Sequence, residues 1–162
     1  MKNRLIKRQV KSGTGIKGKY TITKYKAGTK EVISTQEVDN LVVANAGSGT
    51  DLITRRLIGD NTYSLEIDSA SIGTGTDIPS TADTGLQSPV LADIARTKAI
   101  STPTSVTLDF FIPDATLANG SYSEFGLFCG DRLFARSIIA PAFTKSTGED
   151  TAINYQIILT TS

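Results

Sequence analysis

The side chains that could do chemistry in this chain are acids, hydroxyls and one thiol, because the sequence contains no histidine. Without an imidazole there can be no Ser-His-Asp or Cys-His arrangement, no His-ligated metal and no ordinary proton shuttle near neutral pH. The one cysteine, Cys129, excludes an internal disulfide and a cysteine-built zinc site. Because Cys129 ends an apolar run that starts at Phe125, we expect a small buried side chain rather than a nucleophile.

Two glycine-rich stretches could be mistaken for phosphate-binding loops, at residues 73–76 (GTGT) and 13–18 (GTGIKG). A P-loop needs Gly-x-x-x-x-Gly-Lys-Ser/Thr between a strand and a helix, and the first lysine after residue 76 is Lys98. The earlier stretch has neither a strand before it nor a helix after it. We interpret both as structural turns and expect no cofactor.

Asp77, Asp83 and Asp93, with the Ser and Thr residues between them, offer oxygen atoms that Ca²⁺ could use. Their spacing differs from that of a 12-residue calcium loop. We therefore expect no metal site.

Glu66, Asp68, Asp109 and Glu124 fall on expected strands and could supply the paired carboxylates of a glycoside hydrolase. A polysaccharide-cleaving groove is normally lined with aromatic rings, and this chain has no Trp. We interpret these acids as solvated strand faces and expect no enzymatic activity. Glu124 is the exception, because it opens an apolar strand. With Arg96 and Arg136 in neighbouring segments, we predict a half-buried ion pair among these three residues that fixes strand register.

The elements that must hold these residues are mostly strands. Val106, Leu108, Phe110 and Ile112 alternate with Thr107, Asp109 and Phe111, so one face is apolar and Phe111 is predicted to be an exposed interface residue. Similar patterns predict strands or strand blocks at 20–26, 31–35, 41–44, 64–68, 94–100, 123–139 and 153–159, with a hairpin turn at Gly130-Asp131. The pattern indicates an all-β, antiparallel two-sheet β-sandwich, jelly-roll-like.

One helix is expected over residues 51–58, because Leu52, Ile53, Leu57 and Ile58 follow a helical spacing. Ser48 or Thr50 would cap it, and it would close one end of the sandwich. The polar connection over residues 73–92 is long for a compact domain, and such loops usually serve binding or assembly.

Charge is divided unevenly along the chain. The first 30 residues hold ten Lys or Arg and no acid, whereas the remainder holds all 16 acids against seven bases. We expect a basic N-terminal arm at 1–18 and one sandwich domain at 19–162. A solvated tail and nucleic-acid contact are alternatives, but the arm lacks the aromatics that nucleic-acid stacking uses. We favour docking on a neighbouring subunit through the basic residues of the arm, namely Lys2, Arg4, Lys7, Arg8 and Lys11.

No stretch approaches the roughly 20 apolar residues that span a bilayer, and the basic start lacks the apolar segment of a secretory signal. We expect a protein that is made and kept soluble in a reducing cytosol, without a membrane partner.

The order of several short segments resembles a module common in tailed-bacteriophage virion proteins. These segments are Ile-Gly-Thr-Gly-Thr at 72–76, Asp83-Thr84-Gly85-Leu86, Ile94-Ala95-Arg96, Glu124–Phe128, Leu133–Arg136, Lys145 and the closing strand at 153–159. Such modules are β-sandwich proteins of tail fibres, baseplates, collars and, less often, capsid surfaces, and the likeness covers roughly the last 90 residues well.

The resemblance implies a non-enzymatic structural protein of the virion, which assembles with itself and with other virion proteins. A tail, baseplate, collar or fibre-attachment role is the leading interpretation. A capsid decoration (cement) protein is one alternative, and a module that binds host glycan through residues 73–92 is another. Because that loop has no aromatic residue, the structural class is favoured over sugar binding.

Overall fold

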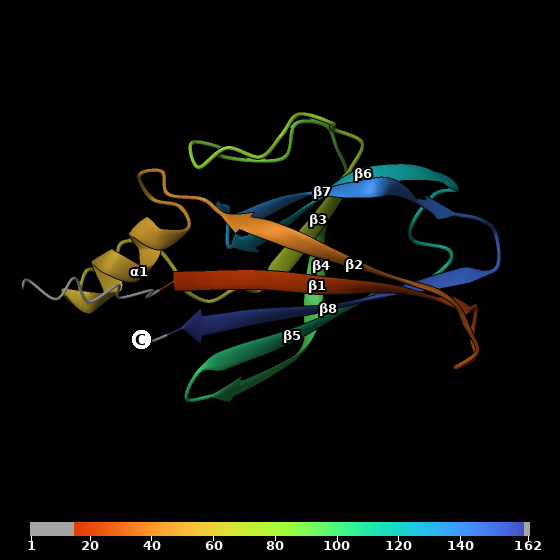
Figure 1. Ribbon diagram of the computed structural model, residues 1–162, viewed down its shortest axis with the longest axis horizontal. Helices are drawn as coiled ribbons and strands as arrows, with labels where there is room; N and C mark the ends of the chain where they lie inside the picture. The colour runs from red at the N-terminus through yellow and green to blue at the C-terminus, as the bar shows by residue number, and fades with distance from the viewer. Residues whose placement is uncertain (1–14, 161–162) are drawn as a thin grey trace, which may run out of the picture.

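The structure is a computed structural model that describes residues 15–160, and Figure 1 shows its course. Within this range it has eight strands and one helix: β1 (Gly15–Lys26), β2 (Val32–Val42), α1 (Thr50–Leu57), β3 (Ser69–Gly73), β4 (Pro89–Thr102), β5 (Ser105–Ile112), β6 (Gly120–Cys129), β7 (Arg132–Lys145) and β8 (Glu149–Thr160). Every strand pair is antiparallel. The expected all-β antiparallel fold with one short helix is confirmed.

The expected two-sheet sandwich is wrong, because the strands form a closed barrel in the order β1-β2-β7-β6-β3-β4-β5-β8. Closure comes from β8, which pairs with β1 along its whole length, from Gly15 opposite Thr160 to Lys26 opposite Glu149. The first and last strands of the described chain are therefore neighbours (Figure 1).

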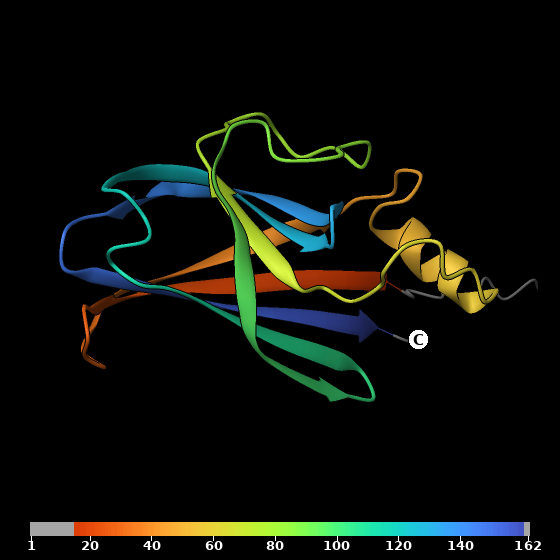
Figure 2. The ribbon, with the colours of Figure 1, turned by 180° about the vertical axis from the view of Figure 1, so that it is seen from behind.

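Two strands turn the corners of the barrel. β2 pairs with β1 up to Asn40 and then with β7 through Leu41 and Val42. β4 pairs with β3 up to Ala95 and with β5 from Arg96, and Figure 2 shows it (green) crossing steeply between the two layers. Register shifts in both of its pairings allow this bend, since a bulge increases local twist and redirects a strand. A strand that belongs to both layers joins what would otherwise be two sheets.

The barrel interior is filled by aromatic and aliphatic side chains. Tyr20, Phe110, Phe125 and Tyr155 are among the largest fully buried residues, and the rings of Tyr20 and Phe125 lie 4.8 Å apart between centroids. The alternation predicted for β5 is confirmed, with Phe110 in the interior and Phe111 facing outward at 44% exposure. The lumen is thus a packed core for most of its length.

Residues 15–18, which were expected to end the N-terminal arm, belong to the barrel. β1 begins at Gly15, and residues 15–18 pair with β8 as part of the barrel. The predicted assembly residues Lys2, Arg4, Lys7, Arg8 and Lys11 lie outside the described residues. The strand predicted at residues 64–68 is wrong, because these residues form no strand and β3 begins only at Ser69.

Helix α1 lies beyond one end of the barrel (Figure 1). Neither Ser48 nor Thr50 caps it, because the N-cap is Gly49, without a side-chain hydrogen bond. Leu52 is buried as expected, whereas Leu57 and Ile58 are 80% and 83% exposed. The helix therefore uses its first turn to pack and leaves apolar side chains of its last turn in solvent.

Gly49 holds the start of this helix in a conformation that only glycine adopts easily, with φ 54°. A Cβ there would lie 1.8 Å from the carbonyl oxygen of Val43, which accepts the Thr50 N–H at 2.9 Å. We predict that Gly49→Ala lowers the free energy of unfolding by about 2 to 4 kcal/mol through strain and overpacking.

Gly59→Ala is the matched control, because Gly59 also has positive φ but open space around it. It should cost only about 1 kcal/mol, from backbone strain alone. Urea unfolding of both variants measures the difference, and equal losses would contradict the proposed clash.

Candidate functional site

The long polar connection lies against the outside of the barrel, over β6 and β7 (Figures 1 and 2). Gly73 belongs to β3 and Pro89 to β4, so the connection itself comprises residues 74–88, hereafter the anchored loop. Its two ends are tied together where the Thr74 N–H donates to the Ser88 carbonyl at 2.9 Å. The feature that holds it down is a single carboxylate.

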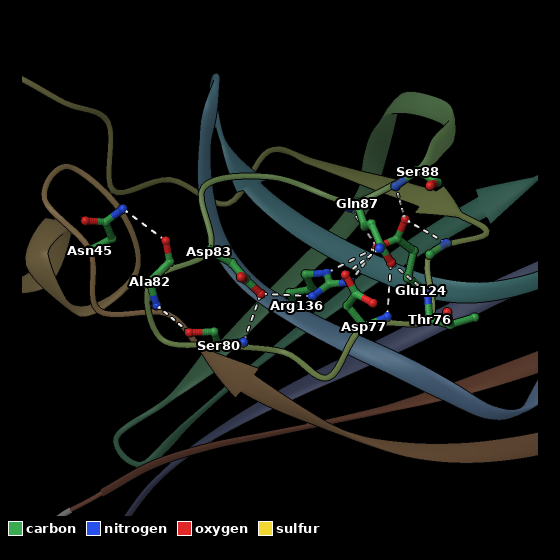
Figure 3. Close-up of polar contacts among 11 residues, drawn as sticks. Asn45, Thr76, Asp77, Ser80, Ala82, Asp83, Gln87, Ser88, Glu124 and Arg136 are labelled. Atoms are coloured by element: carbon green, nitrogen blue, oxygen red, sulfur yellow. Dashed lines mark hydrogen bonds and ion pairs between the residues drawn. The ribbon is translucent and has the colours of Figure 1, made fainter.

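Glu124 points outward from β6 beneath the anchored loop and is fully buried, with 0% exposure. Its Oε1 accepts hydrogen bonds from the backbone N–H of Gly75 at 3.0 Å and of Ser88 at 2.6 Å. Its Oε2 accepts the N–H of Gln87 at 3.0 Å (Figure 3). One carboxylate thus binds both limbs of the loop.

Arg136, on the neighbouring strand β7, neutralises this carboxylate. It is 3% exposed, and its Nε and Nη2 donate to Glu124 Oε2 at 3.1 and 3.0 Å. Its Nη1 donates to Asp83 Oδ2 at 2.9 Å, which adds a contact with the middle of the anchored loop (Figure 3). The predicted pairing of Glu124 with Arg136 is confirmed, and the pair is more deeply buried than expected.

The predicted participation of Arg96 in this pair is wrong. Glu124 lies opposite Gly73 at one end of β3, whereas Ala95 lies opposite Ser69 at the other end. Arg96 instead donates to the Ile67 carbonyl at 2.7 Å and to Glu66 Oε1 at 2.8 Å.

Side chains within the anchored loop complete the network. Gln87 Oε1 accepts the backbone N–H of Thr76 at 2.8 Å and of Asp77 at 3.0 Å. Asp83 Oδ2 accepts the Ser80 N–H at 2.9 Å. At the far end of the loop, the Asn45 side chain donates to the Ala82 carbonyl at 3.2 Å (Figure 3). The oxygens of Asp83 considered for a metal are thus used to order the loop.

Gly75 explains part of the GTGT motif. A Cβ at this position would lie 2.6 Å from the carboxyl carbon of Glu124, so only glycine lets the backbone N–H approach the carboxylate. The motif was interpreted as a turn. The hydrogen bond that Gly75 donates to Glu124, 49 positions away, was not predicted.

Both members of the pair stay charged. Burial alone would raise the pKa of Glu124, but the N–H groups of Ser88 and Gln87, the Arg136 guanidinium and the Gly75 N–H outweigh it, so the pKa lies below its ordinary value. A covered carboxylate with a lowered pKa is a poor proton donor near neutral pH. Its chemistry is that of a structural anchor.

The other acids considered for glycoside hydrolysis are held apart from Glu124 in separate interactions. Glu66 pairs with Arg96 at 2.8 Å. Asp68 accepts the Gly130 N–H at 3.1 Å, and Asp109 accepts a hydrogen bond from the Asn154 side chain at 2.6 Å. Among residues 15–160, no group of three or more His, Cys, Asp or Glu side chains is arranged to hold a metal ion.

Cys129 is buried in the barrel core, as predicted. Burial, followed by the charges of Asp68 and Glu66, raises the pKa of its thiol to about 12. A thiol in that state has almost no thiolate at neutral pH and is unreactive.

A shallow groove of about 370 Å³ lies on the outer face of β1, β4, β5 and β8. Tyr25 and Phe111 line it together with polar side chains, among them Thr23, Asp109 and Asn154. Sequence analysis singled out Phe111 but did not place Tyr25 beside it, because the two lie on strands far apart in the chain. Aromatic rings beside a carboxylate and an amide are the groups that contact a polar, ring-shaped ligand.

Comparison of the chain with protein-family models, with curated proteins and with solved structures found no match. Within the part of the chain that the structure covers, no helix has the length and apolar character needed to cross a membrane.

The burial of the Glu124–Arg136 pair predicts a large loss of stability when its carboxylate is removed. Glu124→Gln keeps the shape of the side chain but leaves the buried Arg136 charge uncompensated and turns an amide N–H₂ toward N–H donors. We expect the free energy of unfolding to fall by about 3 to 5 kcal/mol. Glu66→Gln, which breaks the more exposed pair with Arg96, is the matched control and should cost less than about 1 kcal/mol.

The pH dependence of stability in Glu124→Gln and the native protein tests whether the pKa of Glu124 is lowered in the folded chain. Because the pKa of Glu124 is lower in the folded chain than its ordinary value of 4.5, its stabilisation is complete above about pH 4.5 and is lost as pH falls through the lowered native pKa. Glu124→Gln should therefore lose less unfolding free energy than the native protein between about pH 5 and pH 3. Parallel pH profiles would show that folding does not lower the pKa of Glu124.

Proposed function

We propose that this protein is a non-enzymatic structural component of a tailed-bacteriophage virion, of the tail, baseplate, collar or fibre-attachment type. It assembles as a homo-oligomer and with other virion proteins through its basic N-terminal segment. It is made in the host cytoplasm and ends in the virion.

The observation that carries this proposal is the clustering around Glu124. The segments on which the resemblance to virion modules rests include residues 72–76, Asp83, Glu124 and Arg136, and these meet around one carboxylate (Figure 3). A loop tied by buried charge cannot fold over a ligand without breaking that network. A surface that is already ordered before contact binds a protein partner with little loss of conformational entropy, which suits a part of a large assembly.

The distribution of charge supports assembly as well. The first 30 residues hold ten bases and no acid, and the remainder has nine more acids than bases. Within the barrel, several bases of β1 already pair with acids, such as Lys19 with Glu37 and Lys24 with Glu149. The bases of residues 1–14 precede the first described strand in the sequence, and their charge can complement an acidic neighbour.

Identifying and counting the protein in purified virions tests the proposal. Mass spectrometry of intact particles should detect the chain, and electron microscopy should give its copy number. About 6 to 18 copies would indicate the tail, baseplate or collar, whereas a few hundred would indicate the alternative role of capsid decoration. If the chain is missing from purified particles, the proposal is wrong.

The N-terminal segment gives a direct test of assembly. Deletion of residues 2–14 leaves intact every strand that the structure describes between residues 15 and 160. We predict that this deletion leaves the melting temperature of the isolated protein nearly unchanged but abolishes incorporation into particles.

Replacement of Lys2, Arg4, Lys7, Arg8 and Lys11 by Gln, which keeps the length, should weaken incorporation as well. Raised salt should likewise weaken the incorporation of the native protein, since the contact is electrostatic. Normal incorporation of the deletion variant would show that the segment is not a docking element.

A second candidate function, recognition of a host glycan, is favoured by the groove beside Phe111 rather than by the anchored loop. Tyr25 and Phe111 could stack on the apolar face of a sugar, with Asp109 and Asn154 on its hydroxyls. In that case binding on a glycan array should be lost in Phe111→Ala and kept in Ile78→Ala, a control at an exposed residue of the anchored loop. Absence of any glycan bound by the native protein would exclude this candidate.

A further inference from the structure

The end of the barrel beside α1 contains an apolar pocket of about 460 Å³. Its lining includes Ile16 of β1, Leu159 of β8, Val106 of β5, Ile100 of β4 and Ile53 of α1. The pocket exists because β4 leaves β3 after Ala95 and continues along the other layer, so the two layers separate at this end (Figure 2). The ion pair of Arg96 with Glu66 lies at its edge.

Apolar surface continues from the pocket onto the helix. Leu57 follows Ile53 by four residues and therefore lies on the same side of α1. Leu57 and Ile58 are 80% and 83% exposed, and Ile100 and Leu159 on the pocket wall are also exposed. We call the pocket together with these four residues the apolar end face. Exposed apolar residues gathered around an apolar pocket are a common feature of contact sites.

We propose that the apolar end face binds a second copy of this chain, whose N-terminal segment inserts Leu5 and Ile6 into the pocket. This inference rests on the proposed function and names the surface that the segment uses.

Barrel closure limits the ways in which two copies can associate. The strands described between residues 15 and 160 form a closed ring, in which β2 and β7 pair through only two residues each, so edge pairing between copies would have to use the stretches of strand outside such short contacts. The apolar end face offers association through side chains instead, with an apolar pocket flanked by exposed apolar residues.

The composition of the segment fits the pocket. Leu5 and Ile6 form an apolar pair between Arg4 and Lys7, so two aliphatic side chains can enter the pocket while the flanking charges stay at its edge. Glu66 is there, with a side chain that is 65% exposed and can receive a basic neighbour. Apolar burial supplies the affinity, and the charge supplies orientation.

A second copy fits this surface better than the chain's own segment. Insertion of Leu5 and Ile6 of the same chain would leave Leu57 and Ile58 in solvent, whereas a neighbouring copy can bring its own helix as cover. The ten positions from Leu5 to Gly15 can span about 30 Å, enough to cross to a neighbour. In a two-fold contact each pocket would receive the other copy's segment.

Disulfide trapping in the full-length protein tests the insertion. Ala99 lines the pocket, so Leu5→Cys combined with Ala99→Cys should give a reducible dimer on mild oxidation. The native Cys129 can remain, because its buried thiol has a pKa of about 12. Leu5→Cys with Thr29→Cys is the control, since Thr29 lies in the β1–β2 turn at the opposite end of the barrel, and it should give no comparable dimer.

Each single-cysteine variant, oxidised in parallel, shows whether a dimer arises from two identical cysteines. A cross-link confined within one chain would overturn the second-copy assignment. Absence of any cross-link between positions 5 and 99 would overturn the insertion itself.

Self-association gives an independent measurement. Leu57→Glu with Ile58→Glu changes only exposed side chains and should raise the dissociation constant of the dimer at least about tenfold in light scattering or ultracentrifugation. Val32→Glu, the same kind of change at an exposed residue of β2, is the control and should leave the dissociation constant unchanged. The protein could be present in virions as an oligomer while the double change leaves the dissociation constant unaltered and the two cysteines form no cross-link. In that case the end-face inference fails while the proposed function stands. Absence from virions removes the proposed function itself.

Discussion

The ordered surface that the anchored loop forms over β6 and β7 depends on the carboxylate of Glu124. A charge without access to water is costly unless it is paired and fully hydrogen-bonded, and here three backbone N–H groups and the Arg136 guanidinium meet that requirement. The partners come from both limbs of the anchored loop and from β7, so the electrostatic requirement of one side chain is satisfied only when β6, β7 and the anchored loop are all in place. The 15 residues between β3 and β4 thereby become a fixed surface, although they contain no regular secondary structure.

Within the barrel the constraint is geometric. β2 and β4 each belong to two layers, which requires a change of partner in mid-strand. The bulges of β4 supply the bend, but they also let the layers part beyond Ala95. The apolar pocket beside α1 is the space that this separation leaves, and the exposed Leu57 and Ile58 stand next to it because the helix packs only through its first turn.

The sequence predicted an all-β antiparallel fold with one short helix, and one ion pair. The barrel and the remaining contacts were not predictable from it, for physical reasons. Alternation at Val106–Ile112 locates a strand and its buried face, but a strand of a sandwich and a strand of a barrel have the same alternation, so closure by β8 on β1 was not predictable from it. Glu124 could be recognised because an acid in an apolar strand needs a partner. Its main partners, however, are backbone N–H groups, which have no signature in a sequence. Arg96 was assigned to the wrong acid because which residues lie opposite one another along β3 depends on strand register.

Closure of the barrel by its first and last strands has a consequence for how the chain comes to be folded. Gly15 contacts Thr160 across 145 positions, so the final seam cannot form until nearly all of the described chain has left the ribosome. Contacts of such long sequence separation fold slowly, because the entropy of a very large loop is lost before the seam is made. In the interval β1 has an open edge able to pair with other nascent chains. The time that passes before this seam closes therefore affects the yield of correctly folded chains.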